Sequence, residues 1–406
     1  MSALPRLRGL EVTVVETEEK ENMVTLRDPE GISPETVMMA PASFMVASLL
    51  DGKRDAKEIQ KIFAQQFQGH ILTEAEIKEV VAKLDNYGFL ETEKYRKRKG
   101  EVRADFAKLA VRPASHAGTG YPADRLELAA LVRDSMKSTT GGGLIVPAGS
   151  RAVPRGLVAP HIDFARGARV YGSAHRVHEG AKLPPLVVVI GVVHAGAPEP
   201  FILTRKPFET PLGKLDTATE VVDEIEKAAG VNLTAEEYAH RNEHSIEFQL
   251  VWLQELHADE KFRIVPILVS AFEQFTGQAS PLYDERIART MAGLREEVRK
   301  SGALVLASVD WSHVGPRFGD EVELTETLRG KVREADRALM EKAAAGDSEA
   351  FWVEALRDGN ARHVDALSAV YSLIRILSPV EGTILDYDIA DDPAGGIVGT
   401  GAIALR

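Results

Sequence analysis

Short apolar runs alternate with longer helical patterns from residue 156 to residue 405. The apolar runs, which predict strands, cover residues 156–159, 186–192, 263–269, 303–308 and 397–405. The helical patterns cover residues 217–229, 245–256, 283–300, 324–345 and 364–377. Strands that alternate with helices form largely parallel sheets with helices on both faces. The sequence therefore predicts an α/β domain with a mainly parallel sheet flanked by helices.

Residues 1–95 show a different pattern, with helical segments and one short extended segment. Apolar side chains recur on one face of residues 40–50 and again around residues 59–63. Thr73 and Glu76 have the spacing of a capping box, so a helix should begin there. Residues 89–92 should form a short strand. Three helices closed by a strand predict a small winged-helix-like α+β domain.

A chain of 406 residues is too long for one ordinary hydrophobic core, so we expect two domains. The charged and weakly patterned residues 96–111 mark the boundary. We therefore expect a small domain over residues 1–95, a linker over 96–111 and a large domain over 112–406.

The composition excludes several classes of site. The chain has no cysteine, which rules out disulfides, zinc ribbons, iron–sulfur clusters and thiol nucleophiles. A net charge of −12 repels phosphate backbones and argues against nucleic-acid binding, and the basic run at residues 94–99 is interpreted as a solvated linker. Apolar runs fall short of the ~18 residues that span a bilayer, and the first residues lack a signal-peptide pattern. We expect a cytoplasmic protein that does not contact the membrane.

Polar residues follow three of the predicted strands. His161 and Asp163 come just after residues 156–159, His194 follows residues 186–192, and Asp310 and His313 follow residues 303–308. Ligand sites in open α/β sheets form at the carboxyl ends of the strands, where the loops converge. Each histidine alone is more often structural than functional, but three strand ends together favour a site.

A fourth candidate lies where a predicted helix begins. If the helix begins at Ser245, His244 lies at its N-terminus and Glu247 one turn inside, so both side chains can face one point. A capping role for the acidic residue explains the same pattern. Imidazole and carboxylate without thiolate suit iron, manganese, copper or zinc, and imidazoles also relay protons. A serine hydrolase is not indicated, because the sequence has no Gly-x-Ser-x-Gly elbow.

At these residues the sequence resembles the MEMO family, whose bacterial members are known as protein B of the AmmeMemoRadiSam system. The resemblance runs in order through five segments, residues 112–121, 159–174, 193–194, 243–247 and 307–313. It implies a fold similar to the class III extradiol dioxygenases, which hold non-haem iron with two histidines and a glutamate. In MEMO-like proteins the corresponding ligands are two histidines and a cysteine.

By this resemblance His161 and His194 are metal ligands. The family cysteine is replaced by Asn360, a neutral amide that binds a transition metal more weakly than a thiolate. Either His313, Asp310 or Glu247 completes the metal site, or the site has lost its metal. The implied cofactor is a transition metal, with iron first and copper or zinc as alternatives.

The resemblance also suggests roles for the other polar residues. His313 is expected to act as an acid or base, and Asp310 or Glu247 to orient a ligand, with His244 as a further catalytic candidate. His116, Asp163, Arg362 and His363 are expected to line the same pocket. We expect the remaining histidines of the large domain to lie on the surface, namely His175, His178 and His257.

The small domain resembles PqqD-like peptide-binding domains at residues 49–54 and 84–90. Such domains capture a peptide by adding it as a strand to a sheet edge. Two functions stay open. The protein is a metal-dependent oxidoreductase or accessory factor that works with a radical-SAM-type partner, or it is a non-catalytic protein that binds a peptide or protein beside a vestigial metal pocket.

Overall fold

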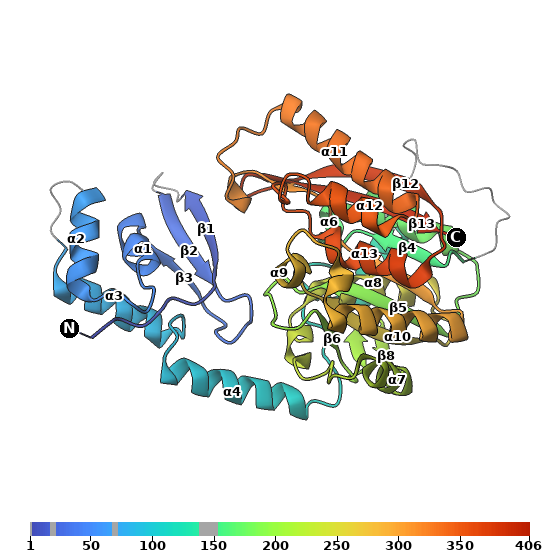
Figure 1. The fold of residues 1–406 in the computed structure, drawn as a ribbon, viewed down its shortest axis with the longest axis horizontal. Helices are drawn as coiled ribbons and strands as arrows, with labels where there is room; N and C mark the ends of the chain where they lie inside the picture. The colour runs from blue at the N-terminus through green and yellow to red at the C-terminus, as the bar shows by residue number, and fades with distance from the viewer. Residues whose placement is uncertain (1, 17–21, 67–71, 138–152) are drawn as a thin grey trace. The chain divides into compact units, whose positions relative to one another are not determined.

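A computed structural model describes residues 2–16, 22–66, 72–137 and 153–406. The chain forms two compact units, Met1–Leu109 and Ala110–Arg406, coloured from blue to red along the chain in Figure 1. Most of residues 96–111, expected as a linker, belong to a helix of the first unit. Residues 138–152 of the second unit, a glycine-rich stretch of the sequence, lie outside the described residues. Among the described helices, none has the length and apolar character needed to cross a membrane.

The first unit packs helices against a three-stranded antiparallel sheet. The strands, in the order β1-β2-β3, are β1 (Glu11–Glu16), β2 (Asn22–Arg27) and β3 (Thr36–Met39). The helices are α1 (Pro41–Ser48), α2 (Ala56–Gln66), α3 (Glu74–Asn86) and α4 (Glu93–Lys108). The predicted capping box is confirmed, since the Thr73 side chain and Glu76 cap α3 reciprocally. The strand expected at residues 89–92 is reduced to one bridge between Leu7 and Leu90.

The second unit is built on an eight-stranded mixed sheet. Seven strands are hydrogen-bonded in the order β11-β13-β4-β10-β5-β9-β6, and the eighth strand, β12, pairs with β13. The strands are β4 (Gly156–Ala159), β5 (Leu186–Val192), β6 (Phe201–Leu203), β9 (Arg263–Val269), β10 (Leu304–Ser308), β11 (His313–Val314), β12 (Gly382–Asp392) and β13 (Gly396–Leu405). The central strands β4, β10, β5 and β9 are parallel. The outer strands are antiparallel, so the expectation of a mainly parallel sheet holds only for its centre. The chain ends in a β12-β13 hairpin, which needs only a tight turn instead of a helical crossover.

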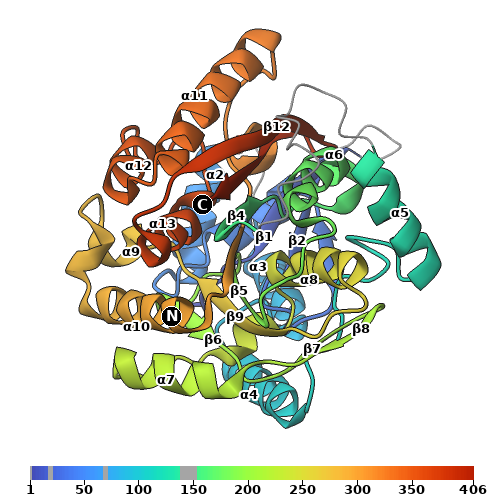
Figure 2. The same cartoon turned by 90° about the vertical axis from the view of Figure 1, so that its right-hand side faces the viewer.

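Helices cover both faces of the sheet, because the central strands are apolar on both sides. In β5, Val188 and Ile190 pack into one core and Val187 and Val189 into the other. Figure 2 shows α6 and α8 on one side of the strands and α10 and α13 on the other. The helices of this unit are α5 (Arg125–Lys137), α6 (Phe164–His175), α7 (Thr219–Ala229), α8 (His244–Leu256), α9 (Glu273–Thr276), α10 (Glu285–Ser301), α11 (Glu326–Ala344), α12 (Ser348–Ala355) and α13 (Ala366–Leu377). A small separate sheet pairs β7 (Phe208–Thr210) with β8 (Gly213–Leu215).

Three histidines expected on the surface are buried, and that expectation is wrong. His175 and His178 have no exposed area and His257 is 4% exposed. The His175 ring stacks on Trp252 with 5.2 Å between the centroids. Side chains at the ends of α6 and α8 are covered here because both helices pack on the same face of the sheet, which the local sequence does not reveal.

The three imidazoles form one hydrogen-bonded chain. Its links join Gln249 to His175 (3.0 Å), His175 to His178 (3.0 Å), His178 to His257 (2.9 Å) and His257 to Glu260 (2.8 Å). The Gln249 amide nitrogen donates to Pro160 O and Ser308 Oγ, so its oxygen is the atom that faces His175.

These four links need four protons, whereas three neutral imidazoles supply three. Burial lowers the pKa of His175 to about 3 and also lowers the pKa of His178, so neither holds a second proton. The additional proton is therefore shared by His257 and Glu260, at the surface end of the chain. Burial raises the pKa of the Glu260 carboxyl, but the hydrogen bonds from His257 and from the backbone of Leu183, with the charge of Lys182, together lower it.

We expect His178→Ala to destabilise the protein by roughly 2–4 kcal/mol, because it leaves buried ring nitrogens of His175 and His257 without partners. Denaturant unfolding measures the change. His363→Asn is the matched control, since the His363 side chain is half exposed and asparagine tolerates its positive φ of 49°. Equal, small effects of both substitutions would contradict a continuous buried chain.

Candidate metal centre

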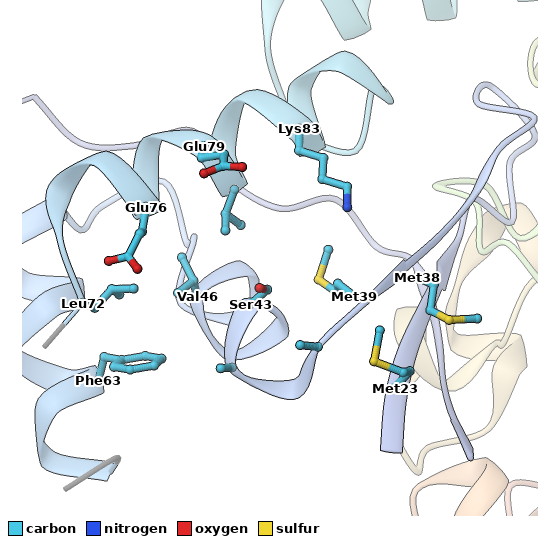
Figure 3. Close-up of a pocket in the computed structure, with 13 residues that line it drawn as sticks. Met23, Met38, Met39, Ser43, Val46, Phe63, Leu72, Glu76, Glu79 and Lys83 are labelled. Carbon is cyan, nitrogen blue, oxygen red and sulfur yellow. The ribbon is translucent and has the colours of Figure 1, made fainter. Parts of the chain in front are cut away.

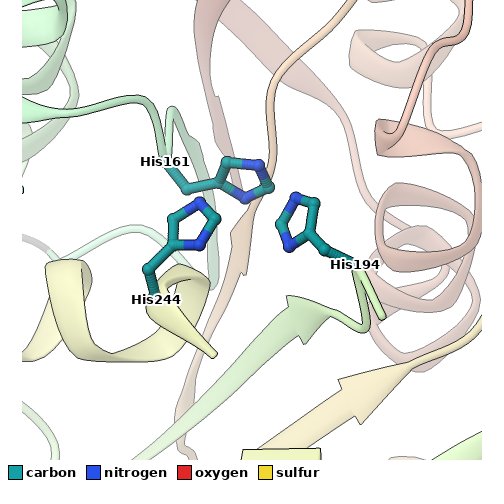
Figure 4. A group of neighbouring side chains, drawn as sticks. All are labelled: His161, His194 and His244. Carbon is teal, nitrogen blue, oxygen red and sulfur yellow. The ribbon is translucent and has the colours of Figure 1, made fainter. Parts of the chain in front are cut away.

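Three imidazoles converge at the carboxyl edge of the sheet. His161, His194 and His244 each offer a ring nitrogen, and these nitrogens lie within 4.8 Å of one another (Figure 4). The ring centroids are 4.9 Å apart for His161 and His194, 5.0 Å for His161 and His244, and 4.6 Å for His194 and His244. The group thus joins both histidines expected as ligands with one expected only as a catalytic candidate.

The fold explains why these rings meet. His161 follows β4 and His194 follows β5, and both strands run parallel to β10, which lies between them. His244 is the first residue of α8. The carboxylate of Glu243 caps this helix by accepting from the backbone of His244 and Ser245, and so fixes where the helix begins.

Hydrogen bonds hold two of the rings with Nε2 toward the centre. His161 Nδ1 lies 3.0 Å from Ser308 O, and His194 Nδ1 lies 3.0 Å from the Glu243 carboxylate. A carbonyl and an ionised carboxylate only accept, so each Nδ1 carries the proton. Each Nε2 then faces the centre and can bind a metal in exchange for a second proton, as in carboxylate–histidine–metal arrangements.

The electrostatics of the centre favour positive charge. Burial lowers the pKa of His161, but the Asp365 and Asp310 carboxylates outweigh it and raise the pKa. Burial is likewise outweighed at His194, whose pKa is raised by Glu243 and Asp365. Burial together with the neighbouring His194 lowers the pKa of His244, which keeps that ring neutral and able to bind a metal.

Asp365 belongs to this centre and was missed in the sequence. Its Oδ2 lies 2.9 Å from His161 Nε2 and 3.7 Å from His194 Nε2. Burial raises the pKa of the Asp365 carboxyl, but His161, His194 and His313 together lower it, so the carboxyl is ionised. Asp365 stands five residues after Asn360, and a carboxylate so close to the family ligand position was the available signal.

Asp310 and His313 lie beside the centre. Asp310 Oδ1 accepts from the backbone of His161, and its Oδ2 lies 3.8 Å from His161 Nε2. Burial raises the pKa of the Asp310 carboxyl. His313 Nδ1 lies 3.1 Å from Trp311 O and 3.1 Å from His363 O, so it carries a proton and leaves Nε2 as an acceptor.

Asn360 and His363 line a cavity of about 310 Å³ together with His194 and Asp365. The Asn360 amide is engaged within its own loop, because Oδ1 accepts from Val364 N at 2.8 Å and Nδ2 donates to Val364 O. Arg362 Nε donates to Ser312 Oγ, and its Nη1 pairs with Asp358.

The structure places the other predicted residues outside the three-histidine group. The Glu247 carboxylate binds Arg112 and Tyr121 and accepts from the backbone of Ser115 and His116. These contacts anchor residues 112–121, so Glu247 does not share one point with His244 as the sequence suggested.

His116 and Asp163, both expected in the pocket, are held by other contacts. The His116 ring packs on His244 with 5.5 Å between the centroids, and His116 Nε2 bonds to Asn242 O. Asp163 caps α6 and pairs with Arg166 at the surface. His116 thus lies behind His244, whereas Asp163 has the role of a helix cap.

Comparison with known proteins identifies the family. The profile of the Memo-like protein family matches residues 112–397. The chain belongs to the Memo-like family. A MEMO1 family protein of Aquifex aeolicus is 30% identical over 367 residues, 90% of each chain, so the match extends into the first unit. A MEMO1 family protein of Thermus thermophilus is 27% identical and covers 86% of this chain and 100% of the relative. The crystal structure of an uncharacterized Escherichia coli K12 protein covers 62% of this chain and all of its own, at 13% identity and a TM-score of 0.38.

Glu247→Gln should destabilise this Memo-like protein by about 3 kcal/mol or more, because it leaves the fully buried Arg112 guanidinium without its counter-ion. Denaturant unfolding measures the change. Glu255→Gln on the same helix is the control and should cost less than about 1 kcal/mol, since its partner Arg133 is 59% exposed. A Glu247→Gln protein of normal stability would show that this carboxylate is not the anchor.

Proposed function

We propose that this Memo-like protein holds one transition-metal ion at His161, His194 and His244 and acts as a metal-dependent oxidoreductase or as an accessory factor. The observation that carries the proposal is the convergence of three ring nitrogens, two of them on rings whose Nδ1 is fixed by Ser308 O and Glu243. Imidazoles near carboxylates, without a thiolate, suit iron best, with copper or zinc as alternatives.

The surrounding residues can be given roles from their own contacts. A bound ion supplies Lewis-acid or one-electron chemistry to a ligand in the 310 Å³ cavity beside His194. His313 does not line that cavity, but it lies close enough to Asp310 and Asp365 to lower the pKa of both carboxyls, so we assign it proton transfer at the edge of the centre. Asp310 keeps the backbone of His161 in place through its hydrogen bond. Glu243 orients His194 and sets the start of α8.

The radical-SAM-type partner is part of the proposal because of the family resemblance noted in the sequence. An accessory role agrees with the peptide binding that we propose below for the first unit, while the metal acts in the second unit. Both roles require the ion to be present.

Anaerobically purified protein should contain about one equivalent of metal by elemental analysis, and His161→Ala and His194→Ala should each abolish it. His313→Gln is the control and should retain the metal, since we place His313 beside the ion and not on it. Metal-free wild-type protein of normal stability would reject the proposal and favour a non-catalytic protein with a vestigial pocket.

A second candidate function, peptide binding, is favoured by a groove in the first unit. The groove has a volume of about 410 Å³ and runs along the edge strand β3 between α1 and α3 (Figure 3). Met23, Met38 and Met39 line it, and Lys83, Glu76 and Glu79 lie on α3 beside it. An edge strand offers unpaired backbone groups, and methionines adapt to varied apolar side chains. We propose that an extended peptide with apolar residues at alternate positions adds to β3.

A displayed library of linear peptides should yield such sequences when it is selected on the whole protein. Val80→Glu, in the groove, should reduce the affinity of a selected peptide at least tenfold in a fluorescence anisotropy titration. Val14→Glu is the matched control, because Val14 is 60% exposed on the opposite edge strand β1. Peptides that bind both variants equally well would place the binding site elsewhere.

A further inference from the structure

We infer that Asp365 is the anionic metal ligand of this protein and takes the place that Asn360 cannot fill. This inference rests on the proposed metal function and adds a ligand to the three histidines. Asn360 turns its amide to the backbone of Val364, and thereby commits both of its polar atoms to its own loop. Asp365, five residues later, turns one oxygen to His161 and His194 instead.

The spacing of these atoms suits ligands of one ion. Asp365 Oδ2 lies 2.9 Å from His161 Nε2 and 3.7 Å from His194 Nε2. Ligand atoms bound at ~2.1 Å to a common metal lie roughly 3.0–3.4 Å apart when they subtend angles of about 90–110°. The two observed separations bracket this range, so only a small adjustment brings Asp365 Oδ2 to bonding distance of an ion held by either histidine.

The second observation is that Asp365 Oδ2 is buried and lacks a hydrogen-bond partner among the described residues. Although His161 Nε2 is only 2.9 Å away, the pair lacks the alignment of a hydrogen bond. The oxygen therefore lies to one side of the Nε2 lone pair. The acceptor of a hydrogen bond lies along the axis of the Nε2 lone pair. A second ligand atom of the same metal lies away from that axis, because the lone pair points at the ion.

Asp365 is well held for such a role. Its Oδ1 accepts a 2.9 Å hydrogen bond from the backbone of Asp310, which leaves Oδ2 to face the histidines. The residue directly precedes α13, and its side chain is 15% exposed at the wall of the cavity. Because the other end of the carboxylate is fixed to the backbone, Oδ2 needs little reorganisation to bind a metal.

A carboxylate in this position also predicts which metals the site prefers. Histidines with one carboxylate suit iron(II), manganese and zinc, whereas thiolate ligands select copper(I). We therefore expect this chain to favour divalent ions over copper(I).

Titration of the whole protein with Co²⁺ tests the inference by calorimetry and by absorption spectroscopy. Asp365→Asn should weaken Co²⁺ binding at least about 100-fold, more than the loss of an orienting partner alone usually costs. Asp365→Cys should restore binding and add a thiolate-to-cobalt charge-transfer band. The chain has no natural cysteine, so such a band can come only from position 365. Asp163→Cys, at the nearby cap of α6, is the control and should show no band.

The outcomes separate the two levels of the proposal. Asp365 is not a ligand if Asp365→Asn binds Co²⁺ as the wild type does, or if Asp365→Cys binds it without the band. If His161→Ala fails to bind Co²⁺ in the same experiment, the histidine site is still supported. If the wild type itself does not bind Co²⁺, Zn²⁺ or Fe²⁺, both the ligand and the proposed function are wrong.

Discussion

The parallel pairing of β4, β10 and β5 is the constraint on which the candidate centre depends. Ala159 pairs with Ser308, and Ala307 pairs with Ile190, so the three strands end within about a residue of one another. His161, Asp310 and His194 each stand two residues beyond a strand end. Equal offsets on parallel strands in register bring three distant parts of the chain to one edge, and no local interaction is needed to gather them.

The sequence allowed the centre of the sheet and two of its histidines to be predicted, because both depend on local patterns. Strands buried on both faces are apolar throughout, and a polar residue just past such a strand is easily recognised. Asp365 does not follow a strand, since it precedes a helix and resembles a helix cap, so its nearness to Asn360 was the one clue in the sequence. The hairpin β12-β13 was missed in part because polar and apolar residues mix along β12. The burial of His175, His178 and His257 depends on how α6 and α8 pack, which no pattern within either helix encodes.

Glu243 shows how one carboxylate can serve the fold and the centre together. It caps α8 and accepts from the backbone of both His244 and His194, while its other contact fixes the His194 ring. The start of the helix and the position of the imidazole are therefore set by the same group. Burial raises the pKa of Glu243, but His194, His244 and the backbone hydrogen bond from Ser245 together lower it, so the carboxylate stays ionised and can make all these contacts.

The hydrogen-bonded chain of buried histidines contacts the residues that hold His161. It ends at Gln249, whose amide nitrogen binds Pro160 O and Ser308 Oγ. Pro160 directly precedes His161, and the carbonyl of Ser308 accepts the proton of His161 Nδ1. Through Gln249, the imidazole chain is therefore connected to Pro160 on one side of His161 and to the Ser308 side chain on the other. A metal ligand must be held to within about 0.5 Å, and a fully satisfied polar network gives that precision where apolar packing alone would allow the backbone to shift.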